Sequence, residues 1–288
     1  MATNPQNLPS DRDARRLTRL YVEAQRTIIQ QIELAVRSGR LQTARLRRLQ
    51  LAAVLAYLDQ IGAATDPLAR QLVAQAVEDG ARLADRDIRR LGATTTPVAE
   101  QAFAAVNQEA VQVATDALTG RLSAARQTVG RTVDDVFRRH GLEQTARALL
   151  GVEGSPQTAS RRLARQLAAG GQTGFVDSAG RQWKLADYAQ MAVRTTTRQA
   201  VVTGQVNRLA SHNINLVEIS RHASPCRICA PMEGRLIDLT GRLTEYRGQP
   251  VSTDTPLPPF HPNCRHTIYG VSVMADQARD QLAAGTAG

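Results

Sequence analysis

Lysine, aromatic residues and cysteine are all scarce in this chain of 288 residues. Aromatic residues make up only 3% of it, whereas Ala, Leu, Gln and Arg are abundant, which favours helices over an all-β fold. Three cysteines in a chain of this length exclude a disulfide scaffold. The most apolar run, Leu49–Leu58, is too short to cross a bilayer, and the first residues lack the pattern of a secretory signal. We therefore expect a soluble intracellular product.

The positive charge is carried almost entirely by arginine. Only one of the 36 basic residues is a lysine, Lys184, and the net charge is +10. Residues 1–150 and 151–288 each carry +5, so no short tail holds the excess. Because Arg binds phosphate and carboxylate groups in a bidentate manner, such a surface favours nucleic acid or an acidic partner. An arginine-rich composition is also what a GC-rich genome produces, and that interpretation stays open.

Apolar residues recur at helical spacing over most of the first 170 residues. Residues 1–9 are expected to form a flexible arm, and Ser10 is the predicted N-cap of a helix that ends at Ser38-Gly39. The apolar stripe of this helix is predicted to comprise Leu17, Tyr21, Ala24, Ile28, Ile32 and Ala35. A second helix is predicted over about 40–62, with one stripe formed by Leu46, Leu49, Ala53 and Ala56. Further helices are predicted from Pro67 to Leu91, from Pro97 to Gly120, and from Pro156 to 170. Residues 121–150 are predicted to form two helices separated by a break at Gly141. The prediction for 10–170 is a bundle of long helices, either compact or elongated and dependent on partners.

The pattern changes at Gly170-Gly171, where we place a domain boundary. The sequence predicts a hairpin over 174–183, a helix over about 185–210, short strands over 216–220, 235–239 and 267–273, and a loop over 240–260. The predicted fold class is mainly α: a long-helix N-terminal bundle (10–170), a small C-terminal α+β subdomain (171–275) and a disordered tail (276–288). Arg194 and Arg198, one turn apart on the helix, are interpreted as a solvated face.

All three cysteines lie close together in the C-terminal region, in a pattern that can hold a metal ion. Cys226 and Cys229 form a Cys-x2-Cys knuckle, and His261, Cys264 and His266 follow in the run His-Pro-Asn-Cys-Arg-His. Two thiolates at this spacing can bind one ion from a tight turn, and a His and a Cys can complete the tetrahedron that Zn²⁺ prefers. We predict a zinc knuckle whose fourth ligand is a histidine.

Several alternatives to a simple zinc knuckle stay open. His222 and His266 are spare candidates that could replace His261 in the fourth position, the cluster could pack without metal, and Cys226 and Cys229 could form a redox dithiol. A catalytic zinc would need an open coordination position and a nearby general base. Glu233 and Asp238 are near in sequence, but no His-x-Glu or Glu-x-x-His spacing accompanies the cysteines. Glu233 is interpreted as a solvated turn residue before Gly234, and we predict no enzyme.

Four motifs in the last part of the chain, taken in order, resemble a known family. They are Gly-Phe-x-Asp-x-x-Gly-x-x-Trp (174–183), Tyr-Ala-x-Met-x-x-Arg-Thr (188–195), Ser-Pro-Cys-x-x-Cys-Ala-Pro-x-Glu-Gly (224–234) and Pro-Pro-Phe-His-Pro-Asn-Cys-Arg-His (258–266). This order resembles the minor capsid proteins of tailed phages, the minor capsid protein 2 group related to Mu F-type head morphogenesis proteins. The matching ligand positions are Cys226, Cys229, His261, Cys264 and His266, and the ending Arg-His departs from relatives that end in Arg-Cys.

The resemblance implies a structural head component without established catalytic activity, located in the virion near the portal or inner capsid and made in the host cytoplasm. The expected partners are portal, scaffold or major capsid subunits, and packaged DNA, and a homo-oligomer is compatible with the same features. Residues 1–50 carry a net charge of +6, which favours contact with an acidic surface or DNA. Two rival hypotheses are a zinc-dependent enzyme on nucleic acid, using His261 or His266 with Glu233, and a zinc-stabilised DNA-binding protein.

Overall fold

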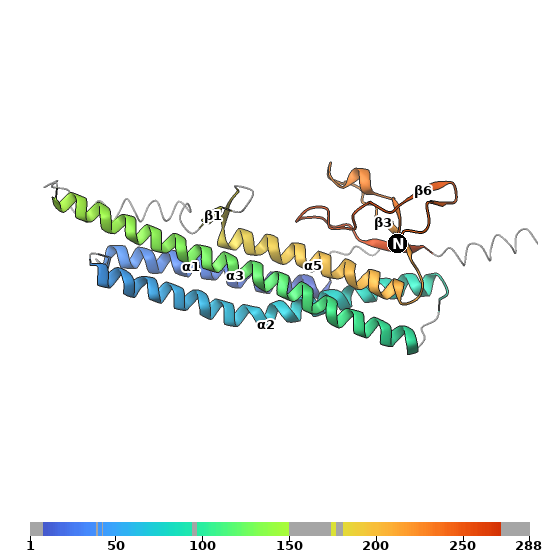
Figure 1. The fold of residues 1–288 in the computed structure, drawn as a ribbon, viewed down its shortest axis with the longest axis horizontal. Helices are drawn as coiled ribbons and strands as arrows, with labels where there is room; N and C mark the ends of the chain where they lie inside the picture. The colour runs from blue at the N-terminus through green and yellow to red at the C-terminus, as the bar shows by residue number, and fades with distance from the viewer. Residues whose placement is uncertain are drawn as a thin grey trace, which may run out of the picture. The chain divides into compact units, whose positions relative to one another are not determined.

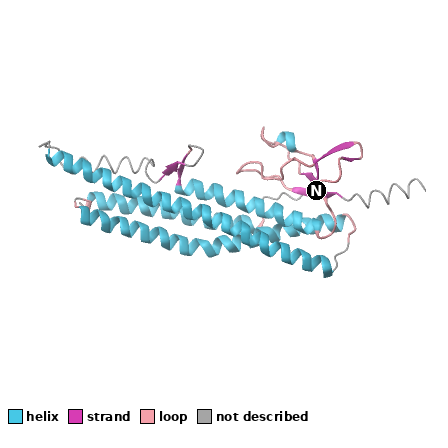
Figure 2. Ribbon diagram, in the orientation of Figure 1, coloured by secondary structure: helices cyan, strands magenta, loops and turns pink. Residues whose placement is uncertain are grey.

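The computed structural model describes residues 8–38, 40–41, 43–93, 97–149, 174–176 and 181–271. Most of them are helical, in α1 (Pro9–Arg37), α2 (Ala44–Arg90), α3 (Pro97–Leu149) and α5 (Leu185–Ala210) (Figures 1 and 2). The strands are β1 (Gly174–Val176), β2 (Gln182–Lys184), β3 (Leu216–Ile219), β4 (Leu236–Asp238), β5 (Glu245–Tyr246), β6 (Gln249–Ser252) and β7 (Ile268–Val271). The predicted mainly α fold with a small C-terminal sheet is confirmed. Among the helices described, none is apolar over a stretch long enough for a membrane span.

The chain divides into two compact units, and each is assembled from separate stretches of sequence. One, here called the strand-bearing unit, comprises Met1–Ala14, Arg70–Asp116 and Arg194–Gly288. The other, here called the helical unit, comprises Arg15–Ala69 and Ala117–Val193. Helices α1, α2, α3 and α5 each contribute a segment to both. The boundary predicted at 170–171, the helix expected over 156–170 and the tail after 275 fall outside the described residues, as does most of the arm.

The helical unit has a core of apolar side chains at helical spacing. The predicted stripe of α1 is confirmed: its members from Leu17 to Ala35 are at most 1% exposed. In α2 the stripe was predicted wrongly, because Val54 and Leu58 are buried whereas Leu49 is 56% exposed. The α3 stripe lies in the same unit and consists of buried residues: Leu118, Leu122, Ala125, Val129 and Val133.

A buried polar group lies inside this core and connects three helices. The guanidinium of Arg126 (α3) donates to the hydroxyl of Tyr21 (α1) at 2.7 Å, and that hydroxyl lies 3.2 Å from Oγ1 of Thr65 (α2). Arg126 also lies 3.6 Å from the carboxylate of Asp66. Because Tyr21 is fully buried, burial raises the pKa of its hydroxyl. The helical unit is therefore held in register by polar contacts as well as by packing.

Three predicted helix breaks are wrong. Pro67 lies inside α2, and Gly120 and Gly141 lie inside α3, which runs for 53 residues. A proline inside a helix costs about 3 kcal/mol and a glycine about 1 kcal/mol, which burial of the flanking turns can offset. Ser10 is not the N-cap either: α1 begins at Pro9, and the N–H of Leu8 donates to the Asp11 carboxylate at 3.2 Å.

In the strand-bearing unit, α2 and α5 pack at glycines. A Cβ atom placed on Gly80 would overlap the carbonyl oxygen of Val201, and one placed on Gly204 would overlap that of Val77. The two helices therefore approach each other so closely that only glycine fits at both positions.

The five-stranded sheet of this unit has the order β5-β6-β4-β3-β7. β3 pairs antiparallel with β4 and β7, and β6 pairs parallel with β4. The predicted hairpin, helix 185–210 and strands near 216, 235 and 267 are confirmed, whereas β5 and β6 arise where only a loop was expected. One face of the sheet shares a core with Ala84 and Ile88 of α2 and with Val202 and Leu209 of α5.

On the outer edge of strand β7, which pairs with no further strand of the sheet, the backbone groups are bonded by side chains of α2 and α5. Asp87 of α2 accepts the N–H of Gly270 at 3.0 Å, and Arg90 donates to the carbonyl of Gly270 at 2.9 Å. Gln205 of α5 donates to the carbonyl of Ile268 at 2.9 Å. This edge is thereby closed against pairing with another strand, and the loop that precedes β7, residues 258–267, is anchored at its C-terminal end.

Candidate metal centre

Two tight turns carry the cysteines. In the first, which follows β3, the carbonyl of Cys226 accepts the N–H groups of Cys229 and Ala230 at 3.0 and 2.9 Å. Cys229 is the N-cap residue of η2 (Ala230–Met232), which follows. In the second turn, which precedes β7, the N–H of Cys264 donates to the carbonyl of His261 at 2.9 Å. Met232 and Phe260 pack against the core between sheet and helices, so both turns are fixed to the same core.

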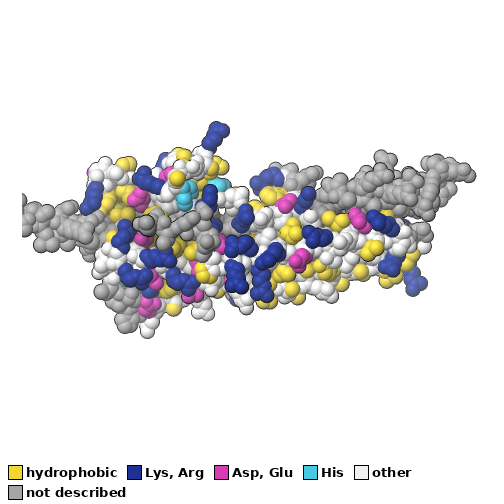
Figure 3. Space-filling model, turned by 180° about the vertical axis from the view of Figure 1, so that it is seen from behind, with side chains coloured by type: hydrophobic (Ala, Val, Ile, Leu, Met, Phe, Trp, Pro, Cys, Tyr) yellow, Lys and Arg dark blue, Asp and Glu magenta, His cyan; other side chains and the backbone are white. Residues whose placement is uncertain are grey.

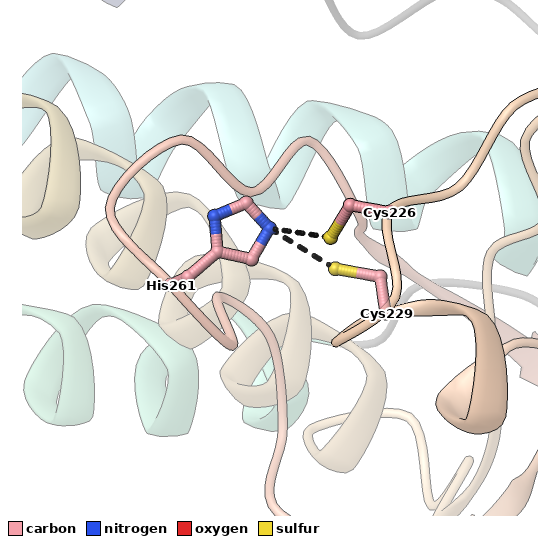
Figure 4. A group of neighbouring side chains, drawn as sticks. All are labelled: Cys226, Cys229 and His261. Carbon is pink, nitrogen blue, oxygen red and sulfur yellow. Dashed lines mark hydrogen bonds between the residues drawn. The ribbon is translucent and has the colours of Figure 1, made fainter.

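The predicted ligand residues come together in space although 35 positions separate the two cysteine turns. Nε2 of His261 lies 3.3 Å from Sγ of Cys226 and 3.2 Å from Sγ of Cys229 (Figure 4). Sγ of Cys229 lies 3.7 Å from Sγ of Cys264, which in turn lies 3.6 Å from Nδ1 of His266. Two groups of three donors result, Cys226–Cys229–His261 and Cys229–Cys264–His266, and they share Cys229.

Within each donor group, these separations suit ligands of a small cation better than a disulfide. In a tetrahedron with metal–sulfur bonds of about 2.3 Å, neighbouring ligand atoms are about 3.5–3.8 Å apart. A disulfide needs its sulfur atoms about 2.05 Å apart, and all three cysteines are free. The donor set of thiolates and imidazoles is the one that zinc sites use, so the residues present fit the ion that their spacing suggests.

The thiols differ in how readily they ionise. Hydrogen bonding from the N–H of Cys229 lowers the pKa of the exposed Cys226 thiol. Cys229 is only 1% exposed, and burial, together with the neighbouring sulfur atoms of Cys226 and Cys264, raises the pKa of its thiol strongly. A bound divalent cation reverses this second effect, because it deprotonates a coordinating thiol. The sulfur of Cys229, which lies beside a second sulfur in each donor group, is thus more stable beside a cation than alone.

Glu233 is not the solvated turn residue that its sequence context suggested. Its side chain is 14% exposed, and Oε1 lies 2.8 Å from Nε2 of His266 and accepts the N–H of His222 at 2.9 Å. Burial raises the pKa of this carboxyl, but the contacts with His266 and the His222 N–H outweigh it, so the pKa is lowered overall. The carboxylate is therefore occupied in holding two histidines.

The other residues considered from sequence take structural positions. His222 belongs to neither donor group, and its Nε2 lies 3.3 Å from the Ser220 hydroxyl. Arg198 is not on a solvated face, since it pairs with Asp11 at 2.9 Å and is 15% exposed. Arg194 donates to Oδ1 of Asn263 at 3.1 Å, within the second cysteine turn.

Asp238 is buried at the end of β4 and arranges the segment that follows. Its carboxylate accepts the N–H groups of Thr240, Arg242 and Leu243 at 2.7 to 3.1 Å. Burial raises the pKa of Asp238, but these donors outweigh that effect and lower it overall. In the sequence, this turn is indicated by the Asp-x-Thr pattern that Asp238 and Thr240 form.

A search of family models matched residues 4–282 to one family, described as phage minor capsid protein 2. No curated protein and no solved structure gave a significant match. The family match spans nearly the whole chain, and so includes both compact units and the cysteine turns.

Proposed function

The chain belongs to the phage minor capsid protein 2 family, and on that premise we propose that it is a minor component of the phage head, bound near the portal or the inner capsid surface. The family is one of structural phage proteins, and the match over residues 4–282 carries the proposal. The partners proposed are portal, scaffold or major capsid subunits. The role of the strand-bearing unit would be to present a surface fixed by the Cys/His cluster.

The proposed metal is Zn²⁺, in a structural role. Thiolate and imidazole donors favour zinc among the common cellular cations. The ligands come from two loops at one end of the sheet, the first following β3 and the second preceding β7. One ion would therefore cross-link residues 226–229 to residues 261–266. In the described residues, the one carboxylate close to the cluster, Glu233, is already engaged by His222 and His266. This engagement supports a structural role rather than catalysis.

Packaged DNA is the second proposed partner, and the solvent-facing side of α1 supports it. Arg15, Arg16, Arg19 and Arg26 are exposed, and in the part of the chain that the structure describes none of them forms an ion pair. Arg15 and Arg19 are one turn apart, a like-charge spacing that costs a helix about 0.2–0.5 kcal/mol. A polyanion would relieve that cost. Figure 3 shows one face of the molecule, on which basic side chains are spread among fewer acidic ones.

Assembly of heads from purified or co-expressed components tests the proposed location. The full chain is co-expressed with the portal, scaffold and major capsid proteins of the same phage, and the heads are sedimented. We expect a small, constant number of copies per head, which are lost when the portal is left out. A chain that stays in the supernatant at all component ratios would contradict the proposal.

DNA binding is tested with a charge-retaining control. Replacing Arg15, Arg16, Arg19 and Arg26 by Gln should weaken binding to random-sequence duplex DNA, and the slope of log affinity against log salt should fall by up to about 4. Replacing the same residues by Lys should leave the slope nearly unchanged. Equal slopes for the Gln and Lys variants would remove α1 from the DNA surface.

A further inference from the structure

The cluster offers more donors than one zinc ion accepts. Three cysteines and two histidines lie around the two turns, whereas a structural zinc site takes four ligands. Since thiolates are the stronger zinc ligands of the set, the choice is between His261 and His266 for the fourth position. The sequence alone leaves this choice open, but the hydrogen bonds of the two rings differ.

His266 presents an unprotonated nitrogen to the sulfur atoms. Its Nε2 lies 2.8 Å from Oε1 of Glu233, and an ionised carboxylate can only accept, so the ring proton is on Nε2. The lone pair is then on Nδ1, which lies 3.6 Å from Sγ of Cys264. A histidine that binds a metal commonly donates its other N–H to a carboxylate, because this fixes the ring and raises its basicity.

The orientation of the His266 ring is fixed from several sides. The ring is 4% exposed, and His222 packs against it edge-on with ring centroids 4.3 Å apart. Oε1 of Glu233 also accepts the N–H of His222, so the carboxylate itself cannot turn away without losing a second hydrogen bond. The ring is thus held in place for a ligand role before any ion binds.

His261 has the opposite arrangement. Its Nδ1 accepts the N–H of Asn263 at 3.3 Å, which leaves the proton of the neutral ring on Nε2. That Nε2 is the atom 3.2–3.3 Å from the sulfur atoms of Cys226 and Cys229 (Figure 4). A ligating nitrogen must be unprotonated, so this ring is arranged as a hydrogen-bond donor to the thiolates.

We propose that His266, oriented by Glu233, completes a Cys3His site with Cys226, Cys229 and Cys264, and that His261 donates a hydrogen bond to the thiolates from outside the coordination shell. The inference rests on the proposed zinc site and assigns its ligands. Glu233 is then a positioning residue, and the site has no free coordination position.

Cobalt substitution with two matched variants tests the assignment. The full-length chain and its variants His266→Cys and His261→Cys are loaded with Co²⁺ under reducing conditions, and the thiolate-to-cobalt charge-transfer absorption is measured per bound ion. Replacing a true histidine ligand by Cys raises the thiolate number from three to four. We therefore expect His266→Cys to raise this absorption by about a third, and His261→Cys to leave it unchanged.

The converse result, a rise in His261→Cys only, would overturn the assignment, as would a rise in both variants or in neither. If His266→Cys does not fold, the unsubstituted chain loaded with ¹¹³Cd decides instead: scalar coupling of cadmium to the His266 ring supports the assignment, and coupling to His261 overturns it. A chain that binds neither cobalt nor cadmium overturns the inference together with the proposed zinc. Incorporation into heads is measured separately and would be untouched by that failure.

Glu233→Gln separates positioning from ligation. The loss of an outer-shell carboxylate commonly lowers metal affinity 10- to 100-fold. We expect a loss of this size in competition with a chelator, while the cobalt spectrum keeps its shape because the four ligands are unchanged. An affinity equal to that of the unsubstituted chain would show that Glu233 does not position the ligand.

Discussion

The helical unit and the C-terminal part of the strand-bearing unit are stabilised by different means. In the helical unit, apolar stripes on α1, α2 and α3 bury side chains from Leu17 to Val133. In residues 214–271, the strands are two to four residues long, and the segments between them are held by Asp238, Glu233, Ser220 and the Cys/His cluster. Long helices are maintained by repeated packing, whereas short strands and loops depend on a few specific polar contacts.

The largest expected difference between the two regions follows metal removal. A chelator, or Cys264→Ser, should release the loops 221–234 and 258–267 because the free energy of zinc binding is then lost to the fold. Hydrogen exchange followed by mass spectrometry should show faster exchange in those two loops, with peptides of α1 and of α3 up to residue 139 unchanged. Exchange that accelerates equally in the helices would mean that the two regions are not stabilised separately.

A second prediction concerns the close contact between α2 and α5 in the strand-bearing unit. Gly204→Ala places a Cβ against the carbonyl of Val77, so the helices must separate, and we expect a loss of about 3 kcal/mol in the free energy of unfolding. Denaturant titration measures this. The matched control is Gly120→Ala, where a Cβ meets no atom within 4 Å and where the change should stabilise the helix by about 1 kcal/mol. Equal effects of the two substitutions would refute the close crossing.

A third prediction concerns the polar contacts inside the helical unit. Tyr21→Phe removes the acceptor of the Arg126 guanidinium and the partner of Thr65, and should cost about 2 kcal/mol because Arg126 stays buried. Tyr57→Phe on α2 is the control, since the structure gives its hydroxyl no partner among the described residues; it should be nearly neutral. Thermal unfolding of both variants decides whether packing alone stabilises this unit.

The smallest predicted effect depends on pH. The folded-state pKa of Asp238 is lowered, so this carboxylate contributes stability above its unfolded value of about 3.9, and the contribution is lost as the pH falls through the folded pKa. Asp238→Asn should cost about 1 kcal/mol at neutral pH, and the gap to the unsubstituted chain should narrow below about pH 4. Urea titrations over this pH range measure it, with the exposed Asp254→Asn as control. A gap that stays constant with pH would show that the charge is not involved.

The same contrast explains which features the sequence could predict. The α1 stripe, α5 and the strands near 216, 235 and 267 follow from local periodicity, and the structure contains them. Pro67 and Gly120 misled because a local breaker signal is outweighed by burial on both sides of it. Gly141 misled as well, since α3 continues through it. Gly80 and Gly204 carry no local signal, since their importance arises only where α2 meets α5.

For the candidate site, motif spacing identified the donor residues, whereas their distances and hydrogen bonds are determined by the fold. The Cys-x2-Cys and His-x2-Cys motifs identify the cluster because each is a turn with two donors. The role of Glu233 could not be predicted, because its partners His222 and His266 lie 11 and 33 positions away. The same is true of the choice between His261 and His266, which depends on tautomers fixed by Asn263 and Glu233.

The most direct test of the account is the metal content of the full-length chain, purified without chelator and under reducing conditions. Elemental analysis should find about one zinc per chain, bound by three thiolates and one imidazole. A natively folded chain that contains no metal, or one in which Cys226 and Cys229 form a disulfide, would contradict the central claim that a metal ion stabilises the C-terminal loops.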